Sequence, residues 1–373
     1  DEAVSKMRGA PGTKVILTIN RFGSVIDYDI TRAIIKIKSI PYYGMVDDST
    51  GYIKLVQFTD NIDKEFKTAL DVLFKEKKAK KLILDLRQNP GGLLPQAISI
   101  SNFFLPKGAD IVSTKSKNKS MEMMFKATQP MYNGFFPLIV LVDDGSASAS
   151  EIVAGAVQDW DRAIILGDTT FGKGSVQSVI DFSKQNKQEM GILKFTTARY
   201  FTPSGRSIDK ELIAYEKKEQ DTSKYWSLGE LKRELIGGGG IIPDYVYQER
   251  YLTANEIELY RKQALMTFVA SYLAKNKMDK KNVPNLSDKI INDYFAYLSE
   301  LEIKTEDIMS DSILYRDNVS QLKYEFARQT GGDDLFYSMF VKNDILVQRA
   351  AELLKNTKDV TEIHDKISGE TAK

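Results

Sequence analysis

Two short, almost entirely apolar runs constrain the fold of this chain more than any other feature. Residues 81–86 and 138–142 each end in a turn rich in glycine or serine, and a helical pattern follows each turn. A strand that is apolar on both faces is typical of a parallel sheet covered by helices. The alternation of such strands with helices predicts an α/β core, whose chemistry lies at the carboxyl ends of the strands.

The rest of the chain predicts further elements by its apolar spacing. Strands are expected at residues 13–21, 32–42, 51–58, 163–166, 176–182 and 191–201, and helices at residues 1–8, 63–78, 94–104 and 152–160. Residues 22–31 are expected to be a connector, residues 210–235 have a weak helical period, and residues 253–357 have a clear one. Residues 358–373 are expected to fray at the end of the chain.

Composition excludes several classes of function. The 373 residues favour two or three domains, and the net charge of +1 argues against a broad surface for nucleic acid. No apolar run approaches the roughly 20 residues of a membrane helix. The chain has no cysteine and one histidine, His364, so thiolate and histidine-rich metal sites are excluded. A Ser-His-Asp triad would require His364 to fold back onto the core.

The turn at residues 145–151, Gly-Ser-Ala-Ser-Ala-Ser-Glu, has two interpretations. Ser148 and Glu151 have the spacing of a capping box, in which the serine caps a helix and the glutamate reaches back to it. Alternatively, Ser148 is a nucleophile on a strand-to-helix turn, where free N–H groups and the helix dipole stabilise an oxyanion. The second interpretation requires a base other than histidine.

Lys173, between Gly172 and Gly174, is the candidate base. It could instead be an exposed loop lysine, since lysine is seldom buried. The segment from Gly167 to Lys173 also matches the phosphate loop G-x-x-x-x-G-K, but Gly174 stands where the hydroxyl residue belongs and a strand pattern follows. A base must be neutral, which requires the pKa of a lysine to fall from about 10.4 to about 7–8. Gln177 could orient its amine.

Several ordered motifs resemble the C-terminal processing (tail-specific) serine proteases. They lie at residues 51–58, 84–92, 145–151, 171–177, 197–206 and 240–244, so that the resemblance covers residues 32–250. It implies a Clp protease/crotonase-like α/β core. It also implies that Ser148 is the nucleophile, Lys173 the base and Gln177 the third member, with an oxyanion hole made by the Ala149 amide and the Gly91–Gly92 turn. The mechanism implied by this resemblance needs neither a metal nor a cofactor.

The resemblance and the helical pattern after residue 250 together predict the domain organisation. Residues 1–22 resemble the last helix and strand of a PDZ domain, residues 23–250 form the protease core, and residues 251–373 form a helical domain that could dimerise, act as a lid or tether the protein. The implied substrates are proteins held by their C-terminal tails, and the implied location is the bacterial periplasm or cell envelope. The alternatives are a catalytically silent crotonase-like scaffold and, less favoured, a P-loop nucleotide binder.

Overall fold

The computed structural model describes residues 2–21, 23–35, 38–182, 191–210, 224–247 and 250–371. The chain divides into two compact units, Asp1–Lys38 and Ser39–Lys373.

The first unit is one helix and one hairpin. Helix α1 (Glu2–Met7) precedes strand β1 (Lys14–Arg21), which pairs in antiparallel fashion with β2 (Ser24–Thr31). The predicted helix and first strand are confirmed, but the connector expected at residues 22–31 is wrong, because β2 pairs with β1 along its whole length. This unit extends to Lys38, beyond the boundary expected after residue 22. Its identity as part of a PDZ domain stays a prediction.

The strand expected at residues 32–42 is also wrong. Its described residues before Tyr42 are not in a strand, and Ile34 and Ile35 are 76% and 84% exposed. The isoleucines give this segment the sequence pattern of a strand, but Ile34 and Ile35 do not pack against a core. The first strand of the second unit, β3, begins at Tyr42.

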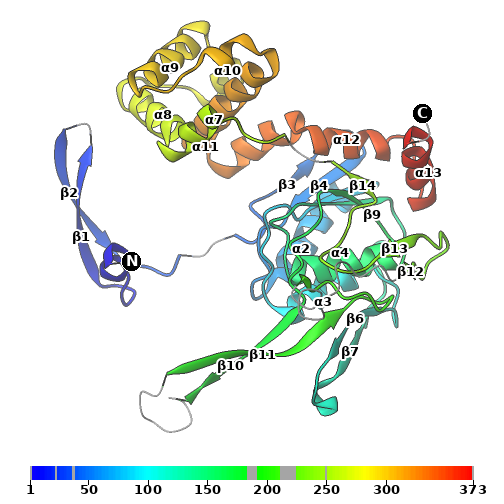
Figure 1. The fold of residues 1–373 in the computed structure, drawn as a ribbon. Coiled ribbons are helices and arrows are strands. Elements are labelled where there is room, and N and C mark those ends of the chain that lie inside the picture. Colours follow the sequence, from blue (N-terminus) through cyan, green and yellow to red (C-terminus); the bar gives the residue numbers. More distant parts are fainter. Residues whose placement is uncertain are drawn as a thin grey trace. The chain divides into compact units, whose positions relative to one another are not determined.

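A six-stranded sheet lies at the centre of the second unit, in the order β14-β9-β8-β5-β4-β3 (Figure 1). Every neighbouring pair is parallel except β3 with β4. Its strands are β3 (Tyr42–Met45), β4 (Thr50–Lys54), β5 (Lys81–Asp85), β8 (Leu138–Val142), β9 (Ile164–Gly167) and β14 (Tyr245–Val246). This mostly parallel sheet with flanking helices confirms the predicted α/β class.

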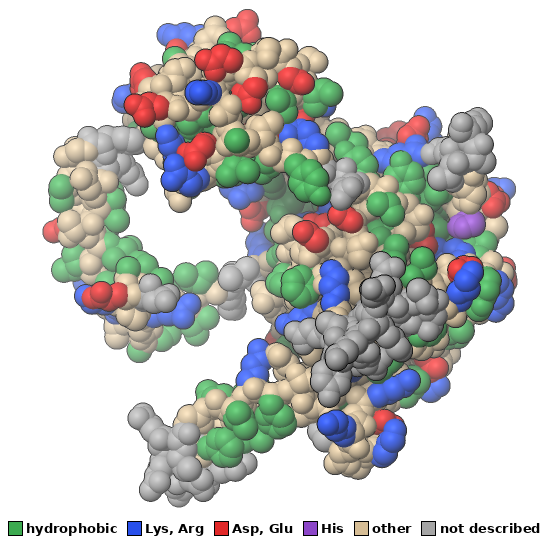
Figure 2. All heavy atoms as spheres, viewed as in Figure 1, with side chains coloured by type: hydrophobic (Ala, Val, Ile, Leu, Met, Phe, Trp, Pro, Cys, Tyr) green, Lys and Arg blue, Asp and Glu red, His purple; other side chains and the backbone are tan. Residues whose placement is uncertain are grey.

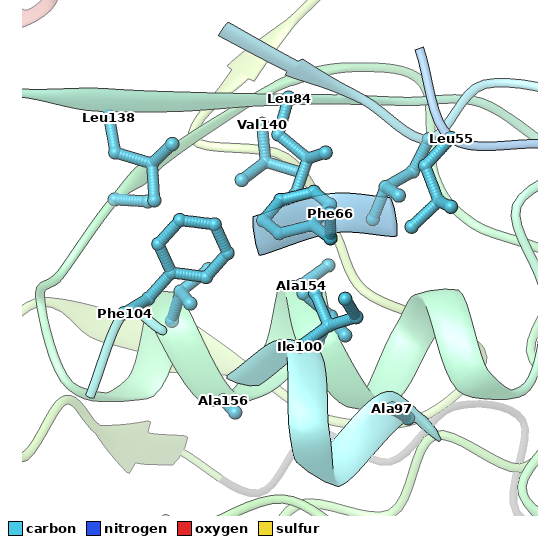
Figure 3. Close-up of a cluster of buried hydrophobic side chains, with 14 of the residues drawn as sticks. Leu55, Phe66, Leu84, Ala97, Ile100, Phe104, Leu138, Val140, Ala154 and Ala156 are labelled. Atoms are coloured by element: carbon cyan, nitrogen blue, oxygen red, sulfur yellow. The ribbon is translucent and has the colours of Figure 1, made fainter. Parts of the chain in front are cut away.

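Three helices cover one face of this sheet: α2 (Ile62–Asp71), α3 (Leu94–Asn102) and α4 (Ala149–Asp159). Helix α2 continues as the π-helical turn η1 (Val72–Glu76). Figure 3 shows Leu138 of β8 directed toward Phe104, which follows α3, and Val140 of β8 directed toward Phe66 of α2. The strands supply alternate residues to this layer, and the remaining alternate residues point to the opposite face.

The C-terminal helices α12 (Ile345–Leu354) and α13 (Val360–Thr371) cover the opposite face. Ile83, Ile139 and Leu141 of the sheet form one buried cluster with Val347 and Ile363 of these helices. The expectation that residues 358–373 fray is therefore wrong for the described part, because α13 buries its apolar side against this layer. Helices α12 and α13 thus form one hydrophobic core with this face of the six-stranded sheet.

A second sheet has the order β10-β11-β6-β7. Its strands are β6 (Asp110–Lys115), β7 (Met123–Lys126), β10 (Ser175–Asp181) and β11 (Ile192–Phe201), and the 3₁₀ turn η2 (Lys119–Met121) joins the first two. Strands β10 and β11 leave the core as a long antiparallel pair, and Figure 2 shows hydrophobic side chains along it. Val179 and Leu193 of these strands are exposed. Strands β6 and β7 were not predicted.

The segment at residues 210–235, with its weak helical period, contains strands instead where it is described. Strands β12 (Lys224–Trp226) and β13 (Glu234–Ile236) pair in antiparallel fashion, while residues 211–223 lie outside the described residues.

Residues 254–343 are helical, as predicted, and enclose a separate hydrophobic cluster around Phe268, Tyr294 and Phe326. The elements are α7 (Ala254–Arg261), α8 (Ala264–Lys275), the 3₁₀ helix η3 (Lys280–Asn285), α9 (Asp288–Glu300), α10 (Glu306–Ser310) and α11 (Ser312–Asn343). Helix α11 is kinked at Gly332, whose φ is 66°. Within the part of the chain that the structure describes, none of the helices is long and apolar enough to span a membrane.

Candidate active site

Ser148 occupies a sharp turn between β8 and α4. Its φ of 56° and ψ of −108° lie outside the regions that a residue with a side chain ordinarily adopts. Such a backbone costs on the order of 1–3 kcal/mol, and strain of this kind clusters at functional sites. A strained serine at a strand-to-helix turn is also the geometry that exposes the hydroxyl of a nucleophile.

The three serines of this turn have different environments. Ser146 and Ser150 are fully buried, and their hydroxyls donate to the carbonyls of Leu86 and Asn89, each at 2.9 Å. Ser148 is only half-buried. The outer two serines therefore hold the turn in place, and the middle serine is the least buried of the three.

The predicted capping box is confirmed at Glu151. Its carboxylate reaches back, with Oε2 accepting from the Ser148 amide at 2.7 Å. The Glu151 amide donates in turn to the Ser148 carbonyl at 3.0 Å. Glu151 therefore has the helix-start role that the spacing predicts.

Glu151 also binds the lysine loop, which is the segment of residues 168–174 between β9 and β10. Its Oε2 accepts from the Lys173 amide at 2.9 Å, and its Oε1 accepts from the Gly172 amide at 2.7 Å and the Thr170 hydroxyl at 2.6 Å. Because Oε2 lies 2.7 Å from the Ser148 nitrogen and 2.9 Å from the Lys173 nitrogen, those two nitrogens can be no farther apart than the sum, 5.6 Å. One carboxylate thus joins the Ser148 turn to the lysine loop.

The carboxylate of Glu151 is fully buried. Burial raises the pKa of this carboxyl above its usual 4.5, and the hydrogen bonds from the surrounding hydroxyl and amides act in the opposite direction. A buried carboxylate is stabilised when its oxygens accept several hydrogen bonds in this way.

The glycines beside Lys173 are required by close packing. Gly172 has a φ of 85°, and a Cβ there would lie 2.5 Å from the side chain of Lys210. A Cβ on Gly174 would lie 2.6 Å from the Cβ of Asp209. Lys173 is half-buried, and the glycines on its two sides pack against Lys210 and Asp209.

The same geometry argues against a phosphate loop. Strand β10 follows Lys173 where a helix N-terminus would have to stand. The amides of Gly172 and Lys173, which would face a phosphate, donate instead to the Glu151 carboxylate. A bound anion would lie against that carboxyl group.

The turn at Gly91 and Gly92 lies against the Ser148 turn. A Cβ on Gly91, whose φ is 98°, would lie 2.9 Å from the Ala149 nitrogen and 2.9 Å from the Ser148 Cβ. Ala149 is the first residue of α4, so its amide has no acceptor within the helix. The Gly91 amide donates to the Asn89 side chain at 2.9 Å and is therefore engaged inside its own turn.

Comparison with known proteins agrees with these motifs. The model of Peptidase family S41 matches residues 49–217. The carboxy-terminal processing protease CtpA of Bacillus subtilis is 33% identical over 356 residues, which are 95% of this chain and 67% of that protein. The chain belongs to peptidase family S41.

Two other relatives match a shorter part of this S41 chain. The carboxy-terminal-processing protease of Bartonella bacilliformis is 48% identical over 213 residues, or 56% of this chain and 47% of its own length. That of Synechocystis is 40% identical over 217 residues, or 56% of this chain and 48% of its own. The chain therefore spans about half the length of these two relatives. A solved photosystem II D1 C-terminal processing protease overlays with a TM-score of 0.44 at 26% identity, covering 64% of this chain and 57% of that one.

Gln177, the predicted third member of the catalytic set, lies on β10. A bulge falls between Val176 and Gln177, and the Gln177 side chain is exposed. Its contact with Lys173 stays a prediction.

His364 lies on α13, with Nδ1 4.0 Å from a carboxylate oxygen of its neighbour Asp365. Among the described residues, no cluster of three or more histidine, aspartate and glutamate side chains is placed to hold a metal ion.

Sequence reasoning missed one residue of this S41 site. Glu151 was assigned to the helix start alone, although half of its hydrogen bonds come from Thr170 and Gly172. The capping-box spacing is a local signal, and it already accounts for the glutamate by a hydrogen bond at the helix start. Nothing in that spacing indicates that a loop about twenty residues later shares the same carboxylate.

Proposed function

We propose that this chain is a serine endopeptidase of the C-terminal processing type. Ser148 is the nucleophile, Lys173 is the general base, and Gln177 orients the amine. The observation that carries the proposal is the Glu151 carboxylate, one oxygen of which accepts from both the Ser148 and the Lys173 amide. A scaffold protein has no need of a strained serine tied in this way to a lysine loop.

In the proposed reaction, the neutral amine of Lys173 takes the proton of the Ser148 hydroxyl as Oγ attacks a peptide carbonyl carbon. The negative charge moves to the carbonyl oxygen, which is stabilised by the Ala149 amide and by an amide of the Gly91–Gly92 turn. Each such donor contributes roughly 3–4 kcal/mol to the transition state. Lys173 then gives its proton to the leaving amine as the C–N bond breaks, and water hydrolyses the acyl-enzyme.

The finer parts of the proposal rest on the family. We infer protein substrates held by their C-terminal tails and action in the bacterial periplasm or cell envelope, with which a chain without cysteine is compatible. Dimerisation through residues 251–373 is part of the same proposal. The exposed apolar side chains of α7 and α8, such as Ile257, Tyr260 and Met266, support it.

The proposal is tested by hydrolysis of an unfolded protein such as β-casein. Ser148→Ala and Lys173→Ala should each abolish cleavage and leave the unfolding transition cooperative. The exposed residues Ser120 and Lys194 provide matched controls, and Ser120→Ala and Lys194→Ala should cleave at the unaltered rate. Unchanged cleavage by Lys173→Ala would remove the lysine from the mechanism. No cleavage by the unaltered chain would favour the silent scaffold.

A further inference from the structure

One carboxylate of the helical region reaches the turn that follows β5. Asp344 caps α12 by accepting from the Val347 amide at 2.8 Å. It also accepts twice from the Arg87 guanidinium, Nη1 to Oδ2 at 3.1 Å and Nη2 to Oδ1 at 3.2 Å. The side chains of Arg87 and Asp344 are 10% and 12% exposed. Paired hydrogen bonds of this kind are the geometry in which arginine fixes a carboxylate most firmly.

Arg87 is held equally firmly on its other side. Its Nη2 donates to the fully buried Asp85 at 2.7 Å, and its amide donates to the same carboxylate at 2.9 Å. Lys54 donates to Asp85 at 3.0 Å and to the Arg87 carbonyl at 2.6 Å, and the Tyr52 hydroxyl donates to Asp85 at 2.8 Å. Two cations therefore face two carboxylates, and Asp344 supplies one of the two negative charges that balance them.

The residues after Arg87 support the Ser148 turn directly. Asn89, two residues on, is fully buried, and its carbonyl accepts from the Ala147 amide at 3.0 Å and the Ser150 hydroxyl at 2.9 Å. Those two donors lie on either side of Ser148. A displacement of Arg87 is therefore passed through two peptide units to the segment that holds the serine.

We propose that Asp344 is a positioning residue of the active site. By fixing Arg87 from the second face of the sheet, it holds residues 88–92 against the Ser148 turn, so that the C-terminal helices complete the catalytic geometry. This inference rests on the proposed function, because it concerns the reactivity of Ser148. It assigns to residues 344–371 a role in the protease core itself, in addition to any role in dimerisation.

The test is the rate at which a fluorophosphonate probe inactivates the full chain. Asp344→Asn removes the charge and keeps the helix cap, since asparagine caps as well as aspartate. Asp311→Asn is the matched control, because Asp311 caps α11 by accepting from the Ile313 and Leu314 amides. Asp344→Asn should lower the limiting rate of inactivation by about tenfold or more and leave the probe's half-saturating concentration within about twofold, since a shift of ~1 Å can cost up to 10²-fold. Asp311→Asn should react at the unaltered rate.

Two further variants separate positioning from general destabilisation. In an Arg87→Gln background, Asp344→Asn should cause no additional loss of rate, because its effect passes through Arg87. Asp344→Glu keeps the charge and should therefore fold even if Asp344→Asn does not, while moving the carboxylate by one methylene. Its limiting rate should fall by less than that of Asp344→Asn.

Three results would overturn the inference while leaving the proposed function intact. They are an unaltered rate for Asp344→Asn or, if that variant does not fold, for Asp344→Glu; an undiminished effect of Asp344→Asn in the Arg87→Gln background; and an equal loss in Asp311→Asn. A failure of the unaltered chain to react at Ser148 would refute the proposed function, and this inference with it.

Discussion

Replacement of Glu151 by glutamine tests whether this carboxylate holds the Ser148 turn and the lysine loop together. An amide has one oxygen where the carboxylate has two, so its NH₂ group must face donors. At the Oε2 position it would face the amides of Ser148 and Lys173. At the Oε1 position it would face the Gly172 amide and the Thr170 hydroxyl. The hydroxyl can rotate and accept, so the second placement leaves only the Gly172 N–H without an acceptor.

The magnitude follows from that one unpaired group. A buried N–H without an acceptor costs about 1–3 kcal/mol, so Glu151→Gln should lower the free energy of unfolding by about that amount. Glu151→Ala leaves all four donors without the carboxylate and should cost more. Because Gly172 directly precedes Lys173, the lysine loop should shift, and a displacement of ~1 Å corresponds to a loss of up to about 10²-fold in rate.

Two assays on the same samples separate stability from reactivity: urea unfolding and inactivation by a fluorophosphonate. The matched control is Glu256→Gln, because Glu256 is a buried capping-box glutamate of α7 that accepts from the Thr253 amide at 2.9 Å. It should lose stability without losing reactivity. If Glu151→Gln reacts at the unaltered rate, Glu151 does not position the lysine loop, and the reasoning fails.

Three further predictions follow from the packing and the buried charges. Gly91→Ala should slow labelling of Ser148 at least tenfold, since its Cβ would meet the Ala147 carbonyl oxygen at 2.6 Å and φ is positive; normal labelling would contradict the close approach. Leu354→Ala should lower the free energy of unfolding by about 2–5 kcal/mol, whereas Ile345→Ala, at an exposed position of the same helix, should change it little; equal urea midpoints would mean that α12 does not cover the sheet. Burial alone would raise the pKa of Asp85, but the charges of Arg87 and Lys54 hold that pKa well below its usual 3.8, so the stability that Asp85 contributes is present above about pH 3.8 and is lost as the pH falls through the folded-state pKa. Urea midpoints measured between about pH 5 and pH 2 should therefore fall more steeply for the unaltered chain than for Asp85→Asn, and parallel curves would contradict this.

The sequence predicted the parts of the fold whose signals are local. Strands β5 and β8 were predicted because residues such as Ile83 and Val140 make both faces of each strand apolar. The partners of those faces could not be predicted, because Val347 and Ile363 lie more than 200 residues away along the chain. Strand β2 was missed although Ile26, Tyr28 and Ile30 alternate with aspartates in the sequence, which is a strand pattern.

The candidate site divides in the same way. The motifs and the family resemblance named Ser148 and Lys173 from the sequence, and the turn conformation of Ser148 agrees with the role proposed for it. The connections between the motifs are non-local hydrogen bonds. Glu151 joins the two loops, and Asp344 meets Arg87 from a helix 257 residues later. Residue spacing does not encode such contacts.

The central claim, that Ser148 is a nucleophile activated by Lys173, is tested most directly by mapping the fluorophosphonate adduct by mass spectrometry. We predict one adduct, on the peptide that contains Ser148, in the unaltered chain and in Lys194→Ala, and none in Lys173→Ala. An adduct on a different serine, or equal labelling of Ser148 in Lys173→Ala, would contradict the claim.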